Sequence, residues 1–203
     1  YGAFFVVATN LLVVLSHQAG YLKANAHLKN TRLAAVSALL ADVYDKQILS
    51  ILYPRLHQLT KNNEVLANRK LSFHSFNWAA LPGKNLTKDF DLPLSPHCHG
   101  YLDQAQLVES DKNGYQLRGW AVDKATTKAA DIVVLATEGH SVVGIAFAGR
   151  PRADVRQHYP NAIDSGWFGH AKVKPGQTIK AYALVNDNRS ICLLRGNFYR
   201  ADE

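Results

Sequence analysis

Apolar and polar residues follow two different periods along this chain, and the change of period divides it into two parts. Between residues 25 and 72, apolar side chains recur every three or four positions, which is the spacing of one face of an α-helix. From about residue 100 onward, short runs rich in valine, isoleucine, leucine and tyrosine are separated by polar turns, which is typical of β-strands. The pattern therefore predicts an α+β chain with helices first and strands afterwards.

Three short helices are expected in the first part. Asn30 or Thr31 is placed to cap the first helix, and Asp45 is placed to cap the second. Pro54 ends the second helix, because proline lacks an amide donor and clashes with the preceding turn, and it suits the first turn of a third helix. Residues 23–72 then form a small helical cluster with too little core to fold alone. We expect it to pack on a neighbouring domain or to lie at a membrane surface.

Residues 1–22 precede this cluster and contain no Lys, Arg, Asp or Glu. A membrane-spanning helix needs ~20 predominantly apolar residues, and this stretch offers about fifteen. We interpret it as the end of a transmembrane helix, with a buried helix of a soluble protein as the alternative. A signal peptide is disfavoured, because no positive region precedes the apolar run. The chain contains no methionine, so we expect Tyr1 not to be the natural start and the chain to be a fragment of a longer protein.

The rest of the chain is predicted to contain a proline-rich linker followed by a domain of short strands. Residues 73–95 are rich in proline and aperiodic, so we expect an extended linker there. Residues 96–203 contain about seven short strands, which indicate an all-β sandwich of the immunoglobulin-like or jelly-roll-like type. Residues 111–114, Asp-Lys-Asn-Gly, are expected to form one of the turns. The expected strands are 100–109, 115–122, 131–137, 142–148, 163–173, 178–185 and 191–195.

The two cysteines lie in the first and last parts of this β domain. In an oxidising compartment Cys98 and Cys192 are expected to form a disulfide, whereas in a reducing cytosol they would remain two buried thiols. Closing so long a loop would stabilise the fold by about 4 kcal/mol in the chain-entropy model. His97 and His99 flank the first cysteine, but strand alternation places them on the opposite face from it, so we expect no metal site. No cofactor is expected either.

The net charge is +7, and the basic excess lies mainly in the first 95 residues. The chain has no run of like charges and no arginine-rich tail. Nucleic-acid binding is therefore not expected, because it favours a clustered basic stripe interleaved with aromatic residues. A solvated basic face near anionic lipid is the interpretation that we prefer.

Four short motifs of the β domain resemble, in their order, the motifs of a known type of β-sandwich module. They are Gly-Trp-Ala-Val-Asp at 119–123, Glu-Gly-His-Ser-Val-Val-Gly at 138–144, Arg-Pro-Arg-Ala-Asp-Val at 150–155 and Gly-Trp-Phe at 166–168. This order resembles the GWA-D/RPDV-type β-sandwich modules that are appended to bacterial glycosyltransferases and to multi-spanning envelope proteins. Two residues, Arg-Ala, are inserted here into the compact Arg-Pro-Asp-Val form.

The resemblance implies an architecture and a location. It places the chain at the C-terminal end of a protein of the bacterial inner membrane, with the β domain in the periplasm. It leaves open whether the full-length protein is a glycosyl-transfer enzyme. We expect a cell-surface glycan as the ligand, and a protein partner is the other possibility.

Polar and aromatic residues near the third motif supply the candidate site. Arginine forks suit carboxylates and phosphates, so this cluster can contact an anion or a glycan phosphate, or Arg150–Asp154 hydrogen bonding can simply hold the loop. Trp120 is expected in the core, whereas Trp167 is the better candidate for an exposed stacking face. The candidate ligand-binding residues are Arg150, Arg152, Asp154, Tyr159 and Trp167.

Motifs of the common enzyme classes do not occur in the sequence. It contains no Gly-x-Ser-x-Gly elbow, Walker loop or dinucleotide fingerprint, and no catalytic residue is predicted. We therefore expect a non-catalytic extracytoplasmic module of a membrane-embedded cell-envelope protein, which binds or positions a glycan or a partner protein. The alternatives are a secreted hydrolase that acts on glycans with two carboxylates from loops, and a structural subunit of a surface assembly.

Overall fold

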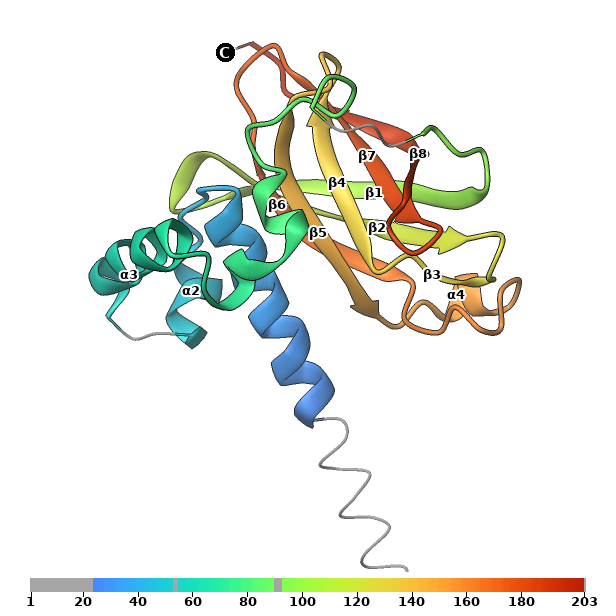
Figure 1. Ribbon diagram of the computed structural model, residues 1–203, viewed down its shortest axis with the longest axis horizontal. Helices are drawn as coiled ribbons and strands as arrows, with labels where there is room; N and C mark the ends of the chain where they lie inside the picture. Colours follow the sequence, from blue (N-terminus) through green and yellow to red (C-terminus); the bar gives the residue numbers. More distant parts are fainter. Residues whose placement is uncertain (1–23, 53–54, 90–92, 203) are drawn as a thin grey trace, which may run out of the picture.

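The computed structural model describes residues 24–52, 55–89 and 93–202, and its helices come first (Figure 1). The predicted membrane-helix end at residues 1–22 and the predicted break at Tyr53-Pro54 lie outside the described residues. Among the helices that are described, none is both long and apolar enough to cross a membrane. The helices are the first helix over residues 24–40, α2 Lys46–Leu52, α3 Leu56–Asn68, and the 3-10 helices η1 Ser72–Ser75 and η2 Asn77–Ala80.

The second part of the chain is a β-barrel. Its strands are β1 Cys98–Val108, β2 Asp111–Asp123, β3 Lys128–Ala129, β4 Ile132–Thr137, β5 Val142–Arg150, β6 Gly166–Lys172, β7 Thr178–Val185 and β8 Ser190–Tyr199, with the short helix α4 Ala153–Arg156 before β6. They follow the order β1-β8-β7-β4-β5-β6-β2-β3, and β1 also pairs with β2. That additional pairing closes seven strands into a barrel, and β3 extends from β2. The α+β prediction is confirmed, but the predicted sandwich is replaced by a barrel, because β1 and β2 join what would otherwise be separate edges.

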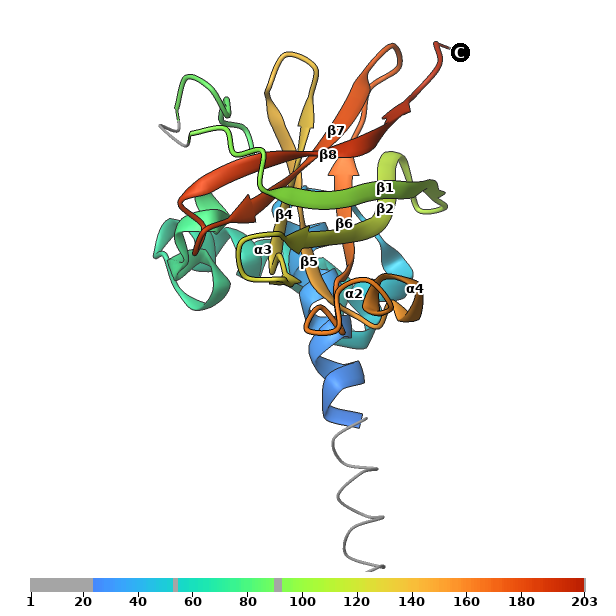
Figure 2. The same cartoon turned by 90° about the vertical axis from the view of Figure 1, so that its right-hand side faces the viewer.

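Neighbouring strands are antiparallel except at one seam. There β1 and β8 run parallel and share one bridge pair, Tyr101 with Arg195 (Figure 2). The Cys98–Cys192 disulfide joins the same two strands, with the Cα atoms 6.0 Å apart. The predicted disulfide is thus confirmed, and it clamps the seam that has the fewest paired residues.

The interior of the barrel is filled by alternate residues of its strands. Trp167 of β6 is fully buried there, and it packs against Gly119 of β2. A Cβ atom at position 119 would lie 2.5 Å from the Trp167 indole and closer still to the carbonyl oxygen of Tyr101. Glycine is therefore required at this point of the Gly-Trp motif, since any side chain would enter occupied space.

The helices that precede the barrel in the sequence cover one side of it (Figure 1). Three residues of the first helix, Leu33, Val36 and Leu40, pack with Trp78 of η2 on the outer face of the sheet. The covered strand residues are Ile132, Val134, Ala136, Val142, Ile145, Phe147, Tyr182, Leu184 and Ile191. This explains why β4 and β7 are buried on both faces and lack the alternation of a half-exposed strand. The first helix also covers β6, where the Ser37 hydroxyl accepts from the backbone N–H of His170.

Several local predictions can be compared with the structure. The cap at Asp45 is confirmed, because the Ile48 backbone N–H donates to its Oδ1 at 3.2 Å. The cap at Asn30 or Thr31 is wrong, because both lie inside a helix that already runs from residue 24, and Asn30 donates instead to the carbonyl oxygen of Gly149.

Two loop predictions also differ from the structure. The turn expected at residues 111–114 is wrong, since β2 begins at Asp111 and the chain turns at residues 109–110. The segment expected to be extended, residues 73–95, contains η1 and η2. Neither β3 nor α4 was predicted.

Candidate functional site

A pocket of about 450 Å³ opens on the outer face of β1 and β2, where α4 and the loop after it lie against these strands. We call it the α4 pocket. It is lined by His99, Trp120, Asp154, Val155, His158 and Tyr159. In Figure 1, α4 lies on the side of the barrel away from α2 and α3.

The pocket has an aromatic wall of three rings. Because Gly119 points into the barrel, the next residue, Trp120, points outward and is half-buried. The His99 ring meets the Trp120 ring edge to face, with centroids 4.9 Å apart. Tyr159 closes the group, and its Oη lies 3.2 Å from Nδ1 of His99. The three rings therefore hold one another in place and leave part of their surface open to a ligand.

An arginine fork borders this wall. Arg152 forms a bidentate contact with Asp154, from Nε at 2.9 Å and from Nη2 at 2.7 Å, and a further ion pair with Asp103 from Nη1 at 2.5 Å. Its guanidinium lies 5.9 Å from the centroid of the Trp120 ring. The hydrogen bonds from Arg152 lower the pKa of Asp154 to about 2, so this carboxylate is ionised at neutral pH. The polar groups beside the aromatic wall are therefore charged and fixed in orientation.

The five predicted ligand-binding residues do not all gather here. Arg152, Asp154 and Tyr159 meet at the α4 pocket. Arg150 lies elsewhere, with its guanidinium 4.2 Å from the centroid of the Phe168 ring, and the loop-holding contact with Asp154 comes from Arg152 in its place. The expectation of an exposed stacking face at Trp167 is wrong, because that side chain is 0% exposed.

The expectation of Trp120 in the core is wrong, because this side chain is half-buried on the outer face of the barrel. Neither pocket histidine was predicted as a site residue. The signal that could have identified Trp120 was the preceding glycine. Successive residues of a strand face opposite sides, so a glycine at a crowded interior position places the next side chain on the outer face. His99 offered a similar signal, because it follows a cysteine that points into the barrel to form the disulfide.

Basic side chains also lie near His99 in the same pocket. Burial lowers the pKa of His99, and the nearby positive charges of Lys124, Arg195 and His158 lower it further. Two of these neighbours are permanent cations at neutral pH, so they favour a ligand that carries carboxylate or phosphate groups.

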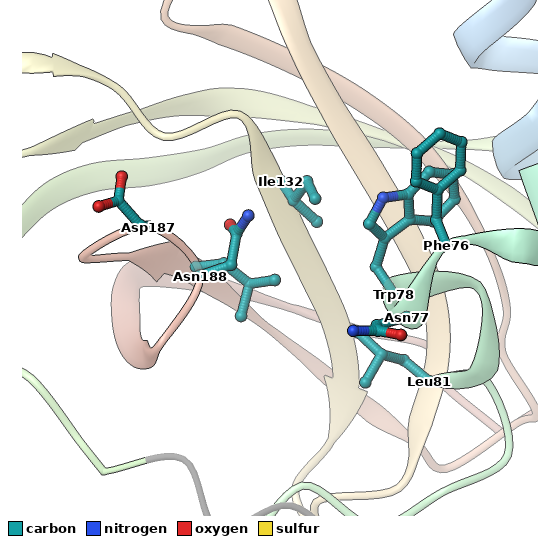
Figure 3. A pocket seen from close by; sticks show the side chains of 8 residues that line it. Phe76, Asn77, Trp78, Leu81, Ile132, Asp187 and Asn188 are labelled. Atoms are coloured by element: carbon teal, nitrogen blue, oxygen red, sulfur yellow. The ribbon is translucent and has the colours of Figure 1, made fainter.

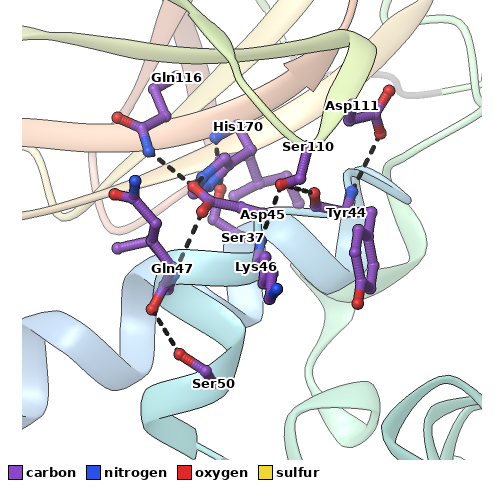
Figure 4. A network of polar contacts seen from close by, with 12 residues as sticks. Ser37, Tyr44, Asp45, Lys46, Gln47, Ser50, Ser110, Asp111, Gln116 and His170 are labelled. Atoms are coloured by element: carbon purple, nitrogen blue, oxygen red, sulfur yellow. Dashed lines mark hydrogen bonds and ion pairs between the residues drawn. The ribbon is translucent and has the colours of Figure 1, made fainter. Parts of the chain in front are cut away.

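A second group of polar residues joins the helices to the barrel (Figure 4). Nε2 of His170 lies 2.9 Å from Oδ2 of Asp45, and the Gln116 amide donates to the same oxygen at 2.6 Å. Burial alone would raise the pKa of Asp45, but hydrogen bonds from His170, Gln116 and the Ile48 backbone together lower it below its ordinary value. The carboxylate is therefore held ionised inside the interface.

Ser37, His170 and Asp45 are the residue types of a hydrolytic triad, but their arrangement is different. The Ser37 hydroxyl donates to the carbonyl oxygen of Ile145 and accepts from the backbone N–H of His170, not from its ring. All three residues are buried, with exposed fractions of 0%, 0% and 2%. A nucleophile needs its base at its hydroxyl and access to substrate, so this network supports docking of the first helix and not hydrolysis.

His97 and His99 flank Cys98, which is itself engaged in the disulfide. The sulfur of Cys98 is bonded to Cys192 and is not available as a thiolate ligand. Within the described ranges of the chain, no three His, Cys, Asp or Glu side chains are placed to hold a metal ion.

Comparisons with known protein families, with curated proteins and with solved structures find no match for this chain.

Proposed function

We propose that this chain is a non-catalytic, extracytoplasmic module that binds a cell-surface glycan at the α4 pocket. The observation that carries the proposal is the combination of an aromatic wall, formed by Trp120, Tyr159 and His99, with the fixed charged groups of Arg152 and Asp154. A sugar ring has an apolar face of C–H groups and a rim of hydroxyls, so it needs an aromatic surface bordered by oriented donors and acceptors. The surrounding cations favour glycans with acidic substituents.

The disulfide supports an extracytoplasmic location. Structural disulfides persist in oxidising compartments and are rare in reducing ones. Cys98 and Cys192 close a loop of 94 residues in the barrel, which makes the bond a structural one. We propose in addition that the module belongs to a membrane-embedded protein of the bacterial envelope, on the resemblance of its motifs and on the apolar character of residues 1–22.

The charges in the α4 pocket favour binding over hydrolysis. A glycosidase needs one carboxyl group whose pKa is raised, so that it can protonate the leaving group. Asp154 has the opposite property, with its pKa at about 2, and Asp103 is paired with the same guanidinium. Both carboxylates orient Arg152 and do not resemble an acid and a nucleophile. The other alternative, a structural subunit of a surface assembly, does not depend on this pocket. A measurement of the mass in solution tests it, since a monodisperse monomer would argue against it.

A glycan microarray tests the proposal. The probe is the fluorescently labelled protein on an array that contains both neutral and acidic bacterial oligosaccharides. We expect retention on a subset enriched in acidic glycans, lost in Trp120→Ala and kept in Tyr199→Ala, which removes an equally large aromatic ring that is 56% exposed and lies outside the described pockets. An absence of retained acidic glycans, or equal retention of the acidic glycans by both variants, would contradict the proposal.

A further inference from the structure

A second pocket, of about 650 Å³, lies on the outer face of β4 and β7. It is placed between η2 and the turn that joins β7 to β8 (Figure 3). We call it the η2 pocket. Phe76 and Trp78 form one wall, and Asp187 and Asn188 of the turn form the opposite wall. Between them, the floor includes the buried side chain of Ile132. It shares no residue with the α4 pocket.

The aromatic wall is rigid and open to solvent. The rings of Phe76 and Trp78 are stacked, with centroids 5.2 Å apart and planes within 8° of each other. Trp78 is in turn fixed by an edge-to-face contact with Phe147, at a centroid distance of 5.0 Å. Phe76 is nevertheless 56% exposed. A large exposed aromatic ring that is already ordered can bind an apolar surface with little further loss of side-chain entropy.

The polar wall is held by an unusual turn. Asn186, Asp187 and Asn188 all have positive φ, at 54°, 53° and 64°. Short polar side chains tolerate this left-handed backbone better than most residues, but three in succession are uncommon. The turn is tied to the β2 strand end, because the Asn186 backbone N–H donates to Oδ2 of Asp123 at 3.2 Å. A carboxylate and an amide are thereby presented opposite the tryptophan.

We propose that the η2 pocket is a second saccharide-binding site, selective for neutral sugars. The stacked rings would cover the apolar face of a pyranose, whose hydroxyls would donate to Asp187 and exchange hydrogen bonds with Asn188. The carboxylate of Asp187 disfavours an anionic ligand. In the α4 pocket, by contrast, the carboxylate of Asp154 is paired with Arg152, and further basic side chains lie near His99. Two sites on one barrel would let the module hold a polymer at two points, with an avidity greater than either affinity.

The three tryptophans provide separate reporters for the test. Trp78 belongs to the η2 pocket and Trp120 to the α4 pocket, while Trp167 is buried in the barrel. In a ¹⁵N-labelled protein each indole N–H gives its own NMR signal, which Trp78→Phe and Trp120→Phe variants assign. The probes are soluble cello-, malto-, manno- and chito-oligosaccharides, together with acidic oligosaccharides.

A saturable shift of the Trp78 signal with a neutral oligosaccharide, and no shift of the Trp167 signal, is the expected result. Phe76→Ala should weaken that binding about tenfold or more, since a central aromatic anchor is removed. The unchanged Trp167 signal of this variant serves as the check that the barrel is folded. Asp187→Asn should relax the selectivity against acidic probes.

The outcomes separate this inference from the proposed function. A shift of the Trp120 signal alone would overturn the second site and leave the α4 pocket intact. A shift of the Trp78 signal alone would support the second site and contradict binding at the α4 pocket. If neither signal moves with any probe, both proposals fail.

Discussion

His170 on β6 and Asp45, directly before α2, form a buried contact in which Nε2 and Oδ2 lie 2.9 Å apart. The two residues are 125 positions apart in the sequence. Around them, Ser110 accepts from the backbone N–H of Lys46 and donates to the carbonyl oxygen of Tyr44 (Figure 4). The beginning of α2 is therefore fixed to the barrel by directed polar contacts, in addition to the apolar contacts of the first helix.

Replacement of the buried carboxylate should destabilise the fold. Asp45→Asn removes the charge and sets an amide N–H₂ against the donors of His170 or Gln116, which leaves buried polar groups unsatisfied. We expect the free energy of unfolding to fall by about 2 kcal/mol, as measured by urea denaturation. The matched control is Asp42→Asn, whose exposed pair with Lys172 should change stability by less than about 0.5 kcal/mol. Equal effects of the two substitutions would show that the Asp45 network does not fix the helices.

The same carboxylate predicts a pH dependence. The pKa of Asp45 is lower in the folded protein than the ordinary value of 3.8, so the folded state favours its ionised form. This contribution to stability is fully present above the unfolded pKa and is lost as the pH falls from ~4 through the folded pKa. Between pH 6 and pH 3, the urea midpoint of the wild type should therefore fall more than that of Asp45→Asn. Asp154 also has a lowered pKa, but it is present in both proteins, so its effect on the urea midpoint cancels when the two proteins are compared. Parallel curves would contradict the assignment.

The Gly-Trp motif predicts a steric requirement at Gly119. Gly119→Ala would place a Cβ against the Trp167 indole and the Tyr101 carbonyl, so we expect a loss of at least about 2 kcal/mol in urea unfolding. Gly139→Ala is the comparison, because its Cβ would meet only Thr137 Oγ1 at 3.8 Å. That variant should remain within about 0.5 kcal/mol of the wild type. If both alanines were tolerated, Trp167 would not pack as described.

The disulfide should contribute more to the free energy of unfolding than its position near two strand ends implies. It closes a loop of 94 residues and joins β1 to β8, where one bridge pair connects the strands. The Cys98→Ala/Cys192→Ala variant should lose about 4 kcal/mol, and the wild type in reductant should unfold at the same urea concentration as the variant. Mass spectrometry should detect two alkyl labels after reduction and none before it. A loss below about 1 kcal/mol would contradict a stabilising clamp.

The positions of most strands along the sequence were predictable, because they depend on local signals. Runs of β-branched residues between turn formers located β4, β5 and β7 nearly to the residue. The turn between β1 and β2 was predicted too late in the sequence, because Asp111 and Asn113 have turn propensity but lie in strand β2. Asp111 accepts from the distant Tyr44 backbone N–H, and no local pattern indicates that contact. Closure into a barrel was missed for a similar reason, since it depends on the pairing of β1 with both β2 and β8.

The candidate site was predicted only in part, and the two tryptophans show why. An alternating pattern distinguishes inside from outside when one face of a strand meets water. In β6 both faces are buried, because the first helix covers its outer side, so the sequence around Trp167 carries no such alternation. The contact between Arg152 and Asp154 is local and lay within the predicted cluster, whereas its third partner, Asp103, comes from β1 and required the fold.

The affinity of the α4 pocket for a glycan in solution is the most direct test of the central claim. Isothermal titration of the best-retained acidic oligosaccharide of the microarray should give a saturable isotherm with wild type. We predict a Kd at least about tenfold higher for Trp120→Ala, equivalent to about 1.4 kcal/mol, and an unchanged Kd for Tyr199→Ala. A Trp120→Ala protein that remains folded and binds with the wild-type Kd would contradict the account.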